Sequence, residues 1–517
     1  MTELSTLDAP NDGDDGLIEP GRMLASIYTT ELTRAASTSE RHADAAAVFR
    51  RAGVSDGQPF VLGPDGSYDL ELNRFFRELS FWGVRAENSI AAYARDVMLF
   101  CRFLHTSRGG KSIWRCDGED LRAYKSVRLH TPGDQQVSVG TWRRSIAALD
   151  KWAAWAIYER LIEAAPFRYQ DKTVLTPQGM KQVRVNVLQE PAGQGDPIRF
   201  LAFEDYLLWR DVGLRGELPD GRADPAWRGR HGERNAIFAD LLIYSGMRLG
   251  EGASLLVPEI PPASAAGGRP LGGVRLSAAV TKRNKARTVF VNRRTLVNLR
   301  RYIDVERDEV VIRCLASDAY RPGESTLWVQ GAGRSGLTLA GGRVSWAYSK
   351  IGMQARRELM AVTDDGEPAG PLWLWLGGDG RPLACSTWQS AFQRANERCA
   401  SFDLELSVSP HTLRHSFAVH MLGLLLRQTV RALGMQSDRR FTHAEVKRLL
   451  IGNTMRKLQL LLGHAHEATV YTYLDVLDEA QEIVAAALDE WDAQAAAFDN
   501  LSVDSAPDDG ETAGATG

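Results

Sequence analysis

The stretch SPHTLRHSFAVHML, residues 409–422, has the pattern of a helix start. Ser409 is a residue type that caps helix N-termini, and Pro410 suits the first helical position because its fixed φ angle matches the helix. Further along, Phe417 and Leu422 belong to an apolar stripe at helical spacing. The stretch therefore predicts a helix that is buried along its later turns and exposes polar groups at its first turn.

Three basic side chains lie at that exposed end. Arg414 and His415 lie three and four positions after His411, so the three share one face of the helix. The first turn also offers unpaired backbone N–H groups and the positive end of the helix dipole, which favour an anion. A guanidinium can hold two phosphate oxygens at once. The pattern is typical of a phosphate-binding helix end, and an exposed helix terminus without a ligand remains the alternative.

A second stretch, LLIYSGMRLGEGASLL (241–256), places an arginine between apolar residues. A helix is predicted to end near Ser245 and Gly246, and a new turn begins around Arg248. A half-buried arginine needs a partner, and Glu251 lies three positions on. Two interpretations stay open: a purely structural ion pair, or a carboxylate that directs Arg248 toward a phosphate.

The remaining polar candidates lie in a predicted hairpin and after a predicted helix end. Lys282 lies in VTKRNKARTVFV (280–291), between two β-prone runs. A lysine there is usually a solvated turn residue, but it can also reach a DNA groove or protonate a leaving oxygen. His464 follows a helix-ending glycine in LLGHAHEATVYTYLDV (461–476), and Tyr473 comes nine residues later. Taken singly, such a histidine is most often a cap and such a tyrosine an interface residue.

In their order along the chain, these stretches resemble the motifs of the tyrosine recombinase (phage integrase) family. The matching segments are SGMRLGE, TKRNKAR, HTLRHSFAVHML and LLGHAHEATVYTY, which contain Arg248, Lys282, His411, Arg414, His464 and Tyr473. The resemblance covers residues 198–490 strongly and 68–170 more weakly, where NSIAAYARDVMLFCRFL is the most typical part. It implies a site-specific DNA recombinase or integrase that cuts and rejoins DNA through a 3′-phosphotyrosine.

The resemblance assigns the nucleophile to Tyr473. That side chain would attack a backbone phosphate and release a 5′-hydroxyl, which would later attack the linkage in turn, so that the bond energy is kept and no ATP is needed. Free tyrosine has a pKa of about 10 and is a poor nucleophile at neutral pH. His411 is the candidate to assist its proton loss. Tyr471 is a competing nucleophile, but the nine-residue offset from His464 favours Tyr473.

The other motif residues are expected to stabilise the phosphate. Arg248 and Arg414 would clamp its non-bridging oxygens, Lys282 would protonate the leaving 5′-oxygen, and His464 would add a hydrogen bond. His415, which follows the catalytic arginine in the family, is expected to be structural. Neither a metal nor any other cofactor is expected, because two arginines supply the positive charge and no carboxylate cluster is apparent.

Charge is distributed unevenly along the chain. The net charge is −3, but residues 1–20 carry six acidic residues, residues 475–517 carry twelve, and neither end carries a basic one. Residues 21–474 therefore carry a net charge of +15. A basic body is compatible with a polyanion such as double-stranded DNA. From charge alone, a solvated surface with acidic tails remains the simpler alternative.

Cysteine usage and hydropathy favour a cytoplasmic protein. The five cysteines are Cys101, Cys116, Cys314, Cys385 and Cys399, and none belongs to a CxxC pair. This spacing argues against a disulfide framework or a zinc knuckle. No run approaches the roughly 20 apolar residues of a membrane span, and the N-terminal residues lack the features of a secretion signal. We expect a bacterial protein without membrane contact that is associated with the nucleoid when on DNA.

The predicted fold class is mainly α with a small β-sheet. An α+β catalytic domain at 198–490 is expected to follow a helical, DNA-binding core-binding domain at 68–170, with a linker at 171–197. Disordered tails are expected at 1–20 and 505–517. The predicted helices are 72–84, 88–106, 140–162 and 233–246, the hairpin strands are 274–280 and 286–291, and helices are expected to return after about 340.

The acidic segment 475–498 has apolar residues at helical spacing. In the family such a helix docks on a neighbouring protomer within a tetramer that holds two DNA sites. We expect a homo-oligomer of this kind, and a helix folded back on its own domain is the alternative. The resemblance also allows accessory DNA-bending or directionality proteins as partners, although the sequence names none.

Two regions depart from the compact family pattern. Residues 416–463 are longer than compact members need, with 427–448 as the predicted insertion, and 310–400 is expanded. A related topoisomerase that relaxes supercoils is the nearest alternative activity. A non-catalytic DNA-binding protein on the same scaffold is a further alternative, which the complete set of six residues disfavours.

Overall fold

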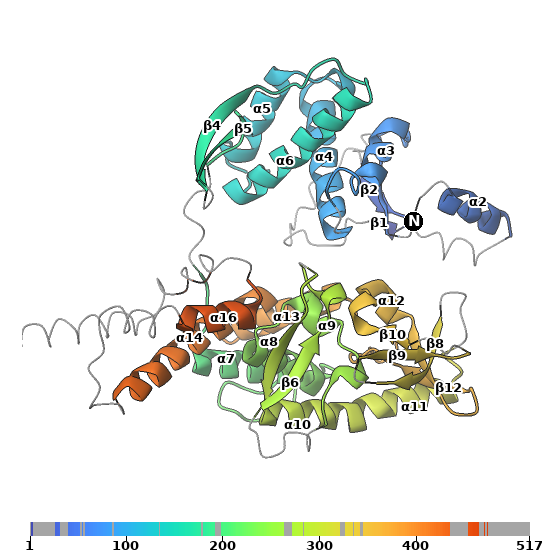
Figure 1. Cartoon of the computed structure of the whole chain (residues 1–517), viewed down its shortest axis with the longest axis vertical. Helices are drawn as coiled ribbons and strands as arrows, with labels where there is room; N and C mark the ends of the chain where they lie inside the picture. The colour runs from blue at the N-terminus through green and yellow to red at the C-terminus, as the bar shows by residue number, and fades with distance from the viewer. Residues whose placement is uncertain are drawn as a thin grey trace, which may run out of the picture. The chain divides into compact units, whose positions relative to one another are not determined.

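The computed structural model describes residues 2–3, 26–30, 40–191, 198–434 and 453–464, with short internal gaps, together with Val470 and Tyr473. The chain divides into two compact units, Met1–Asp196 and Pro197–Gly517. Helices predominate and the sheets are small, as predicted (Figure 1). Within the described residues, we find no helix with the length and apolar character that a membrane crossing requires.

Helices form the body of the first unit. They are α2 (Glu40–Arg51), α3 (Leu70–Glu78), α4 (Glu87–Ser107), α5 (Gly118–Leu129) and α6 (Val139–Tyr158). The apolar stripe of α6 is buried as its spacing predicts, since Trp142, Trp152 and Trp155 are each at most 1% exposed. The helices predicted at 88–106 and 140–162 are confirmed to within a few residues, whereas α2 and α5 were not predicted.

Two small sheets complete the first unit. The antiparallel strands β1 (Thr2–Glu3), β2 (Ser26–Thr29) and β3 (Pro59–Leu62) form one, and the hairpin of β4 (Tyr169–Thr176) and β5 (Gly179–Asn186) forms the other. The start of the predicted disordered tail therefore pairs as β1. The rest of that tail and the tail at 505–517 lie outside the described residues.

The hairpin β4–β5 occupies most of the segment that was predicted to be a linker. Its base is fastened to α6 through Asp150, whose carboxylate accepts hydrogen bonds from the Tyr169 hydroxyl at 2.6 Å and the Asn186 amide at 3.2 Å. Most of β5 is exposed on both faces. The strands therefore lack the alternation of apolar and polar residues that marks a half-buried strand, which is why the sequence suggested a linker.

The second unit contains most of the helices. They are α7 (Phe203–Trp209), α8 (Gly232–Ser245), α9 (Leu249–Ala253), α10 (Arg293–Arg301), α11 (Asp308–Ala316), α12 (Met353–Arg357), α13 (Cys385–Ala400), α14 (Pro410–Gly434) and α16 (Asn453–Leu462). The core surrounds α8, where Phe238 stacks on Trp388 with ring centroids 3.7 Å apart. Both side chains are at most 1% exposed, so α8 is a rigid support for the turns at its ends.

The hairpin predicted in this unit is confirmed. Strands β6 (Leu271–Leu276) and β7 (Arg287–Asn292) are antiparallel, with Leu276 opposite Arg287. The first strand lies about three residues earlier than predicted, because 278–280 forms a 3₁₀ turn. Lys282 consequently lies in the connection between the strands.

A second sheet was not predicted. Its strand order is β10 (Ser345–Ala347), β9 (Gly336–Leu339), β8 (Leu327–Ala332), β11 (Leu359–Val362) and β12 (Pro368–Pro371), with β8 and β11 parallel. Helices do return after residue 340, as predicted, but the strands β10, β11 and β12 lie among them. These strands have three to six residues, which is too short for a periodic pattern to stand out.

Helix α14 begins where the sequence predicts. It starts at Pro410, and the Ser409 hydroxyl accepts a hydrogen bond from the Thr412 N–H at 3.1 Å. It continues to Gly434, so the first part of the predicted insertion is helical, whereas 435–452 lies outside the described residues. The acidic segment 475–498, predicted to dock on a neighbour, also lies outside them.

Helices α14 and α16 enclose a small apolar core of their own. Its members include Phe417 and Leu422 from α14, Met455 and Leu458 from α16, and Tyr473. Tyr473 is thus held against the face of α14 that follows the basic first turn.

Candidate active site

A tight turn after α8 positions the first arginine. Gly246 ends the helix with a φ of +64°, and a Cβ at this position would collide with the Phe417 ring. The chain can therefore reverse here only because the residue is glycine. Arg248 then caps α9: its N–H donates to a Glu251 carboxylate oxygen at 2.8 Å, and its guanidinium donates to the other oxygen at 3.1 Å.

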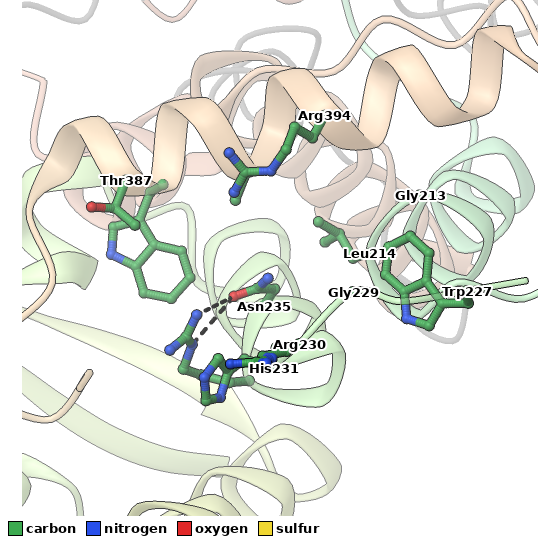
Figure 2. Close-up of a pocket in the computed structure, with 12 residues that line it drawn as sticks. Gly213, Leu214, Trp227, Gly229, Arg230, His231, Asn235, Thr387 and Arg394 are labelled. Atoms are coloured by element: carbon green, nitrogen blue, oxygen red, sulfur yellow. Dashed lines mark hydrogen bonds between the residues drawn. The ribbon is translucent and has the colours of Figure 1, made fainter. Parts of the chain in front are cut away.

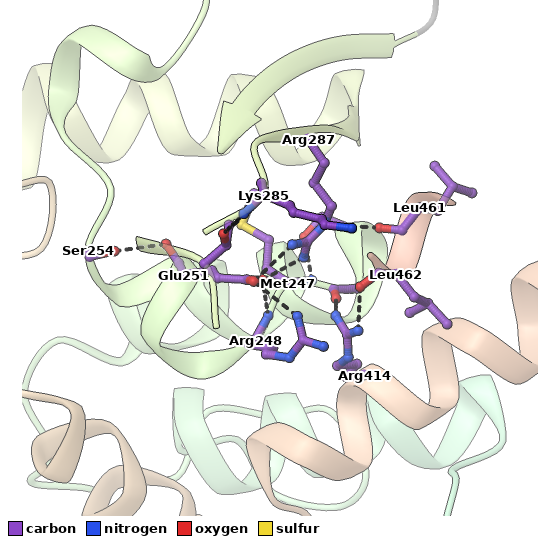
Figure 3. A network of polar contacts seen from close by, with 12 residues as sticks. Met247, Arg248, Glu251, Ser254, Lys285, Arg287, Arg414, Leu461 and Leu462 are labelled. Atoms are coloured by element: carbon purple, nitrogen blue, oxygen red, sulfur yellow. Dashed lines mark hydrogen bonds and ion pairs between the residues drawn. The ribbon is translucent and has the colours of Figure 1, made fainter. Parts of the chain in front are cut away.

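Glu251 is shared between two arginines (Figure 3). Arg287, the first residue of β7, donates to its two oxygens at 2.9 and 2.6 Å. Burial raises the pKa of the Glu251 carboxyl, but hydrogen bonds and charge from Arg287 and Arg248 outweigh that effect and hold the pKa below its usual range. Glu251 is therefore an ionised, almost fully buried anchor, 1% exposed. Arg287 was not predicted, because nothing in the local sequence indicates a partner 36 residues earlier.

Arg414 is buried, and its hydrogen bonds within the described residues go to backbone carbonyls. Its guanidinium donates to the backbone oxygens of Gly246 and, at 2.6 Å, of Leu462, and it is 2% exposed. Burial and then the nearby charge of Arg248 lower the pKa of Arg414 to about 9, so the group still carries its charge at neutral pH. No carboxylate of the described part of the chain hydrogen-bonds to it.

Tyr473 lies close enough to Arg248 and Arg414 for their positive charges to act on its hydroxyl. Its side chain is 3% exposed, and its hydroxyl is 3.1 Å from Nδ1 of His415. Burial raises the pKa of the Tyr473 hydroxyl, while Arg414 and Arg248 oppose this rise. The tyrosine and the two arginines therefore share one neighbourhood.

The two histidines of the first turn of α14 have different environments. Their ring centroids are 4.2 Å apart, edge to face. Burial, followed by His411 and Arg414, lowers the pKa of His415 to about 4. Burial, followed by Arg414, Arg248 and Lys282, also lowers the pKa of His411.

Of the two histidines in the first turn of α14, His415 is the one whose ring reaches the Tyr473 hydroxyl. The assistance of His411 and the structural role of His415 stay predictions, to which the structure adds a direct contact between His415 and the tyrosine hydroxyl. The two residues occupy one helix face, and the tyrosine comes 58 residues after His415. Sequence spacing alone therefore gave no means of telling which ring would reach it.

Lys282 and His464 meet Arg248 around a cavity of about 310 Å³. Lys285 and Arg456 add further positive charge to its lining. The ring centroid of His464 is 6.4 Å from that of Tyr473. The structure thus gathers all six predicted residues around one cationic site, whereas the competing Tyr471 lies outside the described residues.

A second cavity, of about 280 Å³, lies at the other end of α8 (Figure 2). Its lining includes Arg230, His231, Arg234 and Arg394, and none of the six predicted residues. The Arg234 guanidinium there donates to the Leu376 carbonyl at 2.7 Å. Among the described residues, no group of three or more His, Cys, Asp or Glu side chains is arranged to hold a metal ion.

Two family models match the chain. The model of the phage integrase N-terminal SAM-like domain matches residues 72–160, and the model of the phage integrase family matches residues 226–430. The second match contains four of the six predicted residues and ends before His464 and Tyr473.

Individual relatives are more distant. The tyrosine recombinase XerC of Alcanivorax borkumensis is 30% identical over 160 residues, which cover 31% of this chain and 40% of XerC. The match thus spans less than half of that relative. A solved structure of the XerH site-specific recombinase bound to a palindromic difH substrate is 14% identical to this chain. The alignment covers 78% of this chain and 80% of the XerH chain, with a TM-score of 0.42. A lambda integrase dimer bound to a COC′ core site is 12% identical to this chain. That alignment covers 78% of this chain and 93% of the lambda integrase chain, with a TM-score of 0.37.

The two family matches together include more than half of the chain, and the second contains the motifs of Arg248, Lys282, His411 and Arg414. The chain therefore belongs to the phage integrase family of tyrosine recombinases.

Proposed function

We propose that this protein is a site-specific recombinase that cuts and rejoins double-stranded DNA through a 3′-phosphotyrosine at Tyr473, without metal or ATP. The observation that carries the proposal is the charge of Arg414. Its guanidinium is buried, its charge opposes the rise in the pKa of the Tyr473 hydroxyl, and no described carboxylate hydrogen-bonds to it. A buried cation of this kind is stabilised by an anionic ligand, and a DNA phosphate brings that anion to the tyrosine.

In the first step, the Tyr473 oxygen forms a bond to phosphorus and the bond from phosphorus to the 5′-oxygen breaks. Arg248 and Arg414 receive the non-bridging oxygens, where negative charge develops. Preorganised donors of this type are typically worth about 3–4 kcal/mol each. Lys282 gives a proton to the leaving 5′-oxygen, and His464 hydrogen-bonds to the phosphate.

His415 holds the nucleophile before the reaction. With a pKa of about 4 its ring is neutral at pH 7, so Nδ1 can accept a hydrogen bond from the Tyr473 hydroxyl. This bond orients the oxygen, and the proton that the hydroxyl loses passes to solvent as the bond to phosphorus forms. His411, which is exposed and lies in the field of Arg414, Arg248 and Lys282, then contacts the phosphate rather than the tyrosine.

In the second step, a 5′-hydroxyl attacks the phosphotyrosine, and Tyr473 leaves with its proton restored. Exchange between two duplexes breaks four strands, and each break needs its own tyrosine. We therefore propose that four copies assemble on two DNA sites. If the attacking hydroxyl comes from the strand that was cut, the same chemistry relaxes supercoils instead, which is the topoisomerase alternative.

The proposal can be tested with a duplex that the protein selects from a random-sequence pool. We expect wild-type protein to form an adduct with this DNA that survives denaturation, and Tyr473→Phe to bind the DNA without forming it. A plasmid with two copies of the selected site then separates the activities, since a recombinase exchanges the sites and a topoisomerase only relaxes the plasmid. DNA binding without any wild-type adduct would contradict the proposal.

A further inference from the structure

We propose that Arg287 is a positioning residue of this site, which orders Arg248 through Glu251 and orders His464 through the end of α16. The inference rests on the proposed DNA cleavage at Tyr473. It concerns a residue at the start of β7, outside the six polar residues of the motifs.

The first link is the Glu251 carboxylate. Arg287 binds its two oxygens at 2.9 and 2.6 Å, and the same carboxylate accepts from the backbone N–H and the guanidinium of Arg248. Glu251 is 2% exposed in its side chain and Arg287 is 10% exposed. Because a two-point contact fixes both the place and the rotation of a carboxylate, Arg287 determines where Glu251 can hold the Arg248 guanidinium.

The second link is the last turn of α16. The Nε of Arg287 donates to the Leu461 carbonyl at 3.3 Å, and Arg414 donates to the next carbonyl, that of Leu462. These carbonyls have no partner within the helix. Gly463 follows with a φ of +65°, and a Cβ there would lie 3.0 Å from Cδ of Arg287. Arg287 therefore packs against the residue that directs the chain from α16 into His464.

A lysine cannot reproduce these contacts. Its ammonium is a single charged point, whereas the guanidinium presents a planar fork of donors that spans both carboxylate oxygens and still reaches a carbonyl. Arg287→Lys should therefore keep the charge of the cavity and the attraction for DNA. What it should lose is the alignment of Arg248 and His464.

The test uses single-turnover cleavage of a nicked form of the selected duplex by the full-length protein. We expect Arg287→Lys to bind this DNA with an affinity within about threefold of wild type and to cleave it roughly 10- to 100-fold more slowly, as for a misplaced catalytic group. Arg398→Lys is the matched control, because Arg398 also joins a carboxylate, that of Asp224 at 2.7 Å, to backbone carbonyls, those of Val212 at 2.8 Å, Gly216 at 3.3 Å and Glu217 at 3.2 Å. The control should cleave at close to the wild-type rate even if it melts at a lower temperature.

A double-mutant cycle separates positioning from general stability. If Arg287 acts through Glu251, Arg287→Lys should cost at least threefold less in a Glu251→Gln background than in wild type. Glu251→Asp is a second probe in case Arg287→Lys does not fold, because the shorter side chain cannot reach both arginines; it should also slow cleavage at least tenfold with DNA affinity retained.

Three results would overturn the inference: wild-type cleavage by Arg287→Lys or Glu251→Asp, an equal loss in Arg398→Lys, or an unchanged penalty in the Glu251→Gln background. The absence of an adduct with wild-type protein would instead reject the proposed function itself. The two failures are therefore distinguishable.

Discussion

Arg414 and Arg248 have similar assigned roles but different supports. Arg248 is one-third exposed and is held by a carboxylate, whereas Arg414 is buried and, among the described residues, is held by carbonyl oxygens. The second arrangement leaves more positive charge for a ligand, because carbonyl dipoles orient a guanidinium without neutralising it. Arg414 should therefore be the more demanding position of the two.

Arg414→Lys is expected to slow single-turnover cleavage by about 10²–10³-fold, the usual effect of removing one preorganised donor. A lysine keeps the charge but cannot bind two carbonyls and two phosphate oxygens with one planar group. Cleavage rate and DNA affinity are to be measured together. A variant that cleaves like wild type would show that the fork geometry of Arg414 is dispensable.

The lowered pKa of His415 predicts a pH-dependent stability. The ring has a pKa of about 4 in the folded chain and 6.5 without the fold. Between these values the unfolded chain binds a proton that the folded chain does not, so the free energy of unfolding falls as the pH drops from 6.5 to 4, and the loss is absent above that window. His415→Gln should flatten this part of the profile in urea unfolding at pH 4.5–7.5. Equal slopes for variant and wild type would contradict the assignment.

The sequence predicted residue types better than residue contacts. Arg248, Lys282, His411, Arg414, His464 and Tyr473 were found because they lie in motifs with a fixed order. Arg287 and the contact of His415 with Tyr473 depend on segments that approach only in the folded chain. Periodicity carries no information about such pairings.

For secondary structure too, the elements with local sequence signals were predicted and those that depend on distant segments were missed. The start of α14 and the helices α4 and α6 were predicted because capping residues and apolar stripes are local signals. The five-stranded sheet and the hairpin β4–β5 were missed because their strands are short or exposed. Their stability comes from pairing with distant segments, which one sequence does not reveal.

The turn between α8 and α9 should be sensitive to a single methyl group. Gly246→Ala places a Cβ against Phe417 at a positive φ and disturbs the carbonyl that Arg414 binds. We expect a loss of about 2–4 kcal/mol in the free energy of unfolding, from overpacking and backbone strain together.

Gly221→Ala is the control, because φ is +83° at this glycine but no atom lies within 4 Å of the added Cβ. It should cost only about 1 kcal/mol. Similar losses in urea unfolding for both variants would show that the Phe417 contact is not what restricts position 246.

On the scale of the assembly, exchange between two duplexes requires several tyrosines to act together. In an equal mixture of wild-type and Tyr473→Phe protein, recombination between two sites should fall to about one sixteenth if four active copies are needed in one complex. The covalent adduct, which needs one active copy, should fall only by half. A fall by half in both assays would contradict a four-tyrosine reaction and favour a topoisomerase-like activity.

The central claim is that DNA becomes joined to the hydroxyl of Tyr473, and mass spectrometry of the adduct tests it most directly. After nuclease and protease digestion of wild-type protein trapped on the nicked duplex, we predict one modified peptide, with a nucleotide 3′-phosphate on Tyr473. A nucleotide on Tyr471 or any other residue, or no modified peptide from protein that has cut the DNA, would contradict the account.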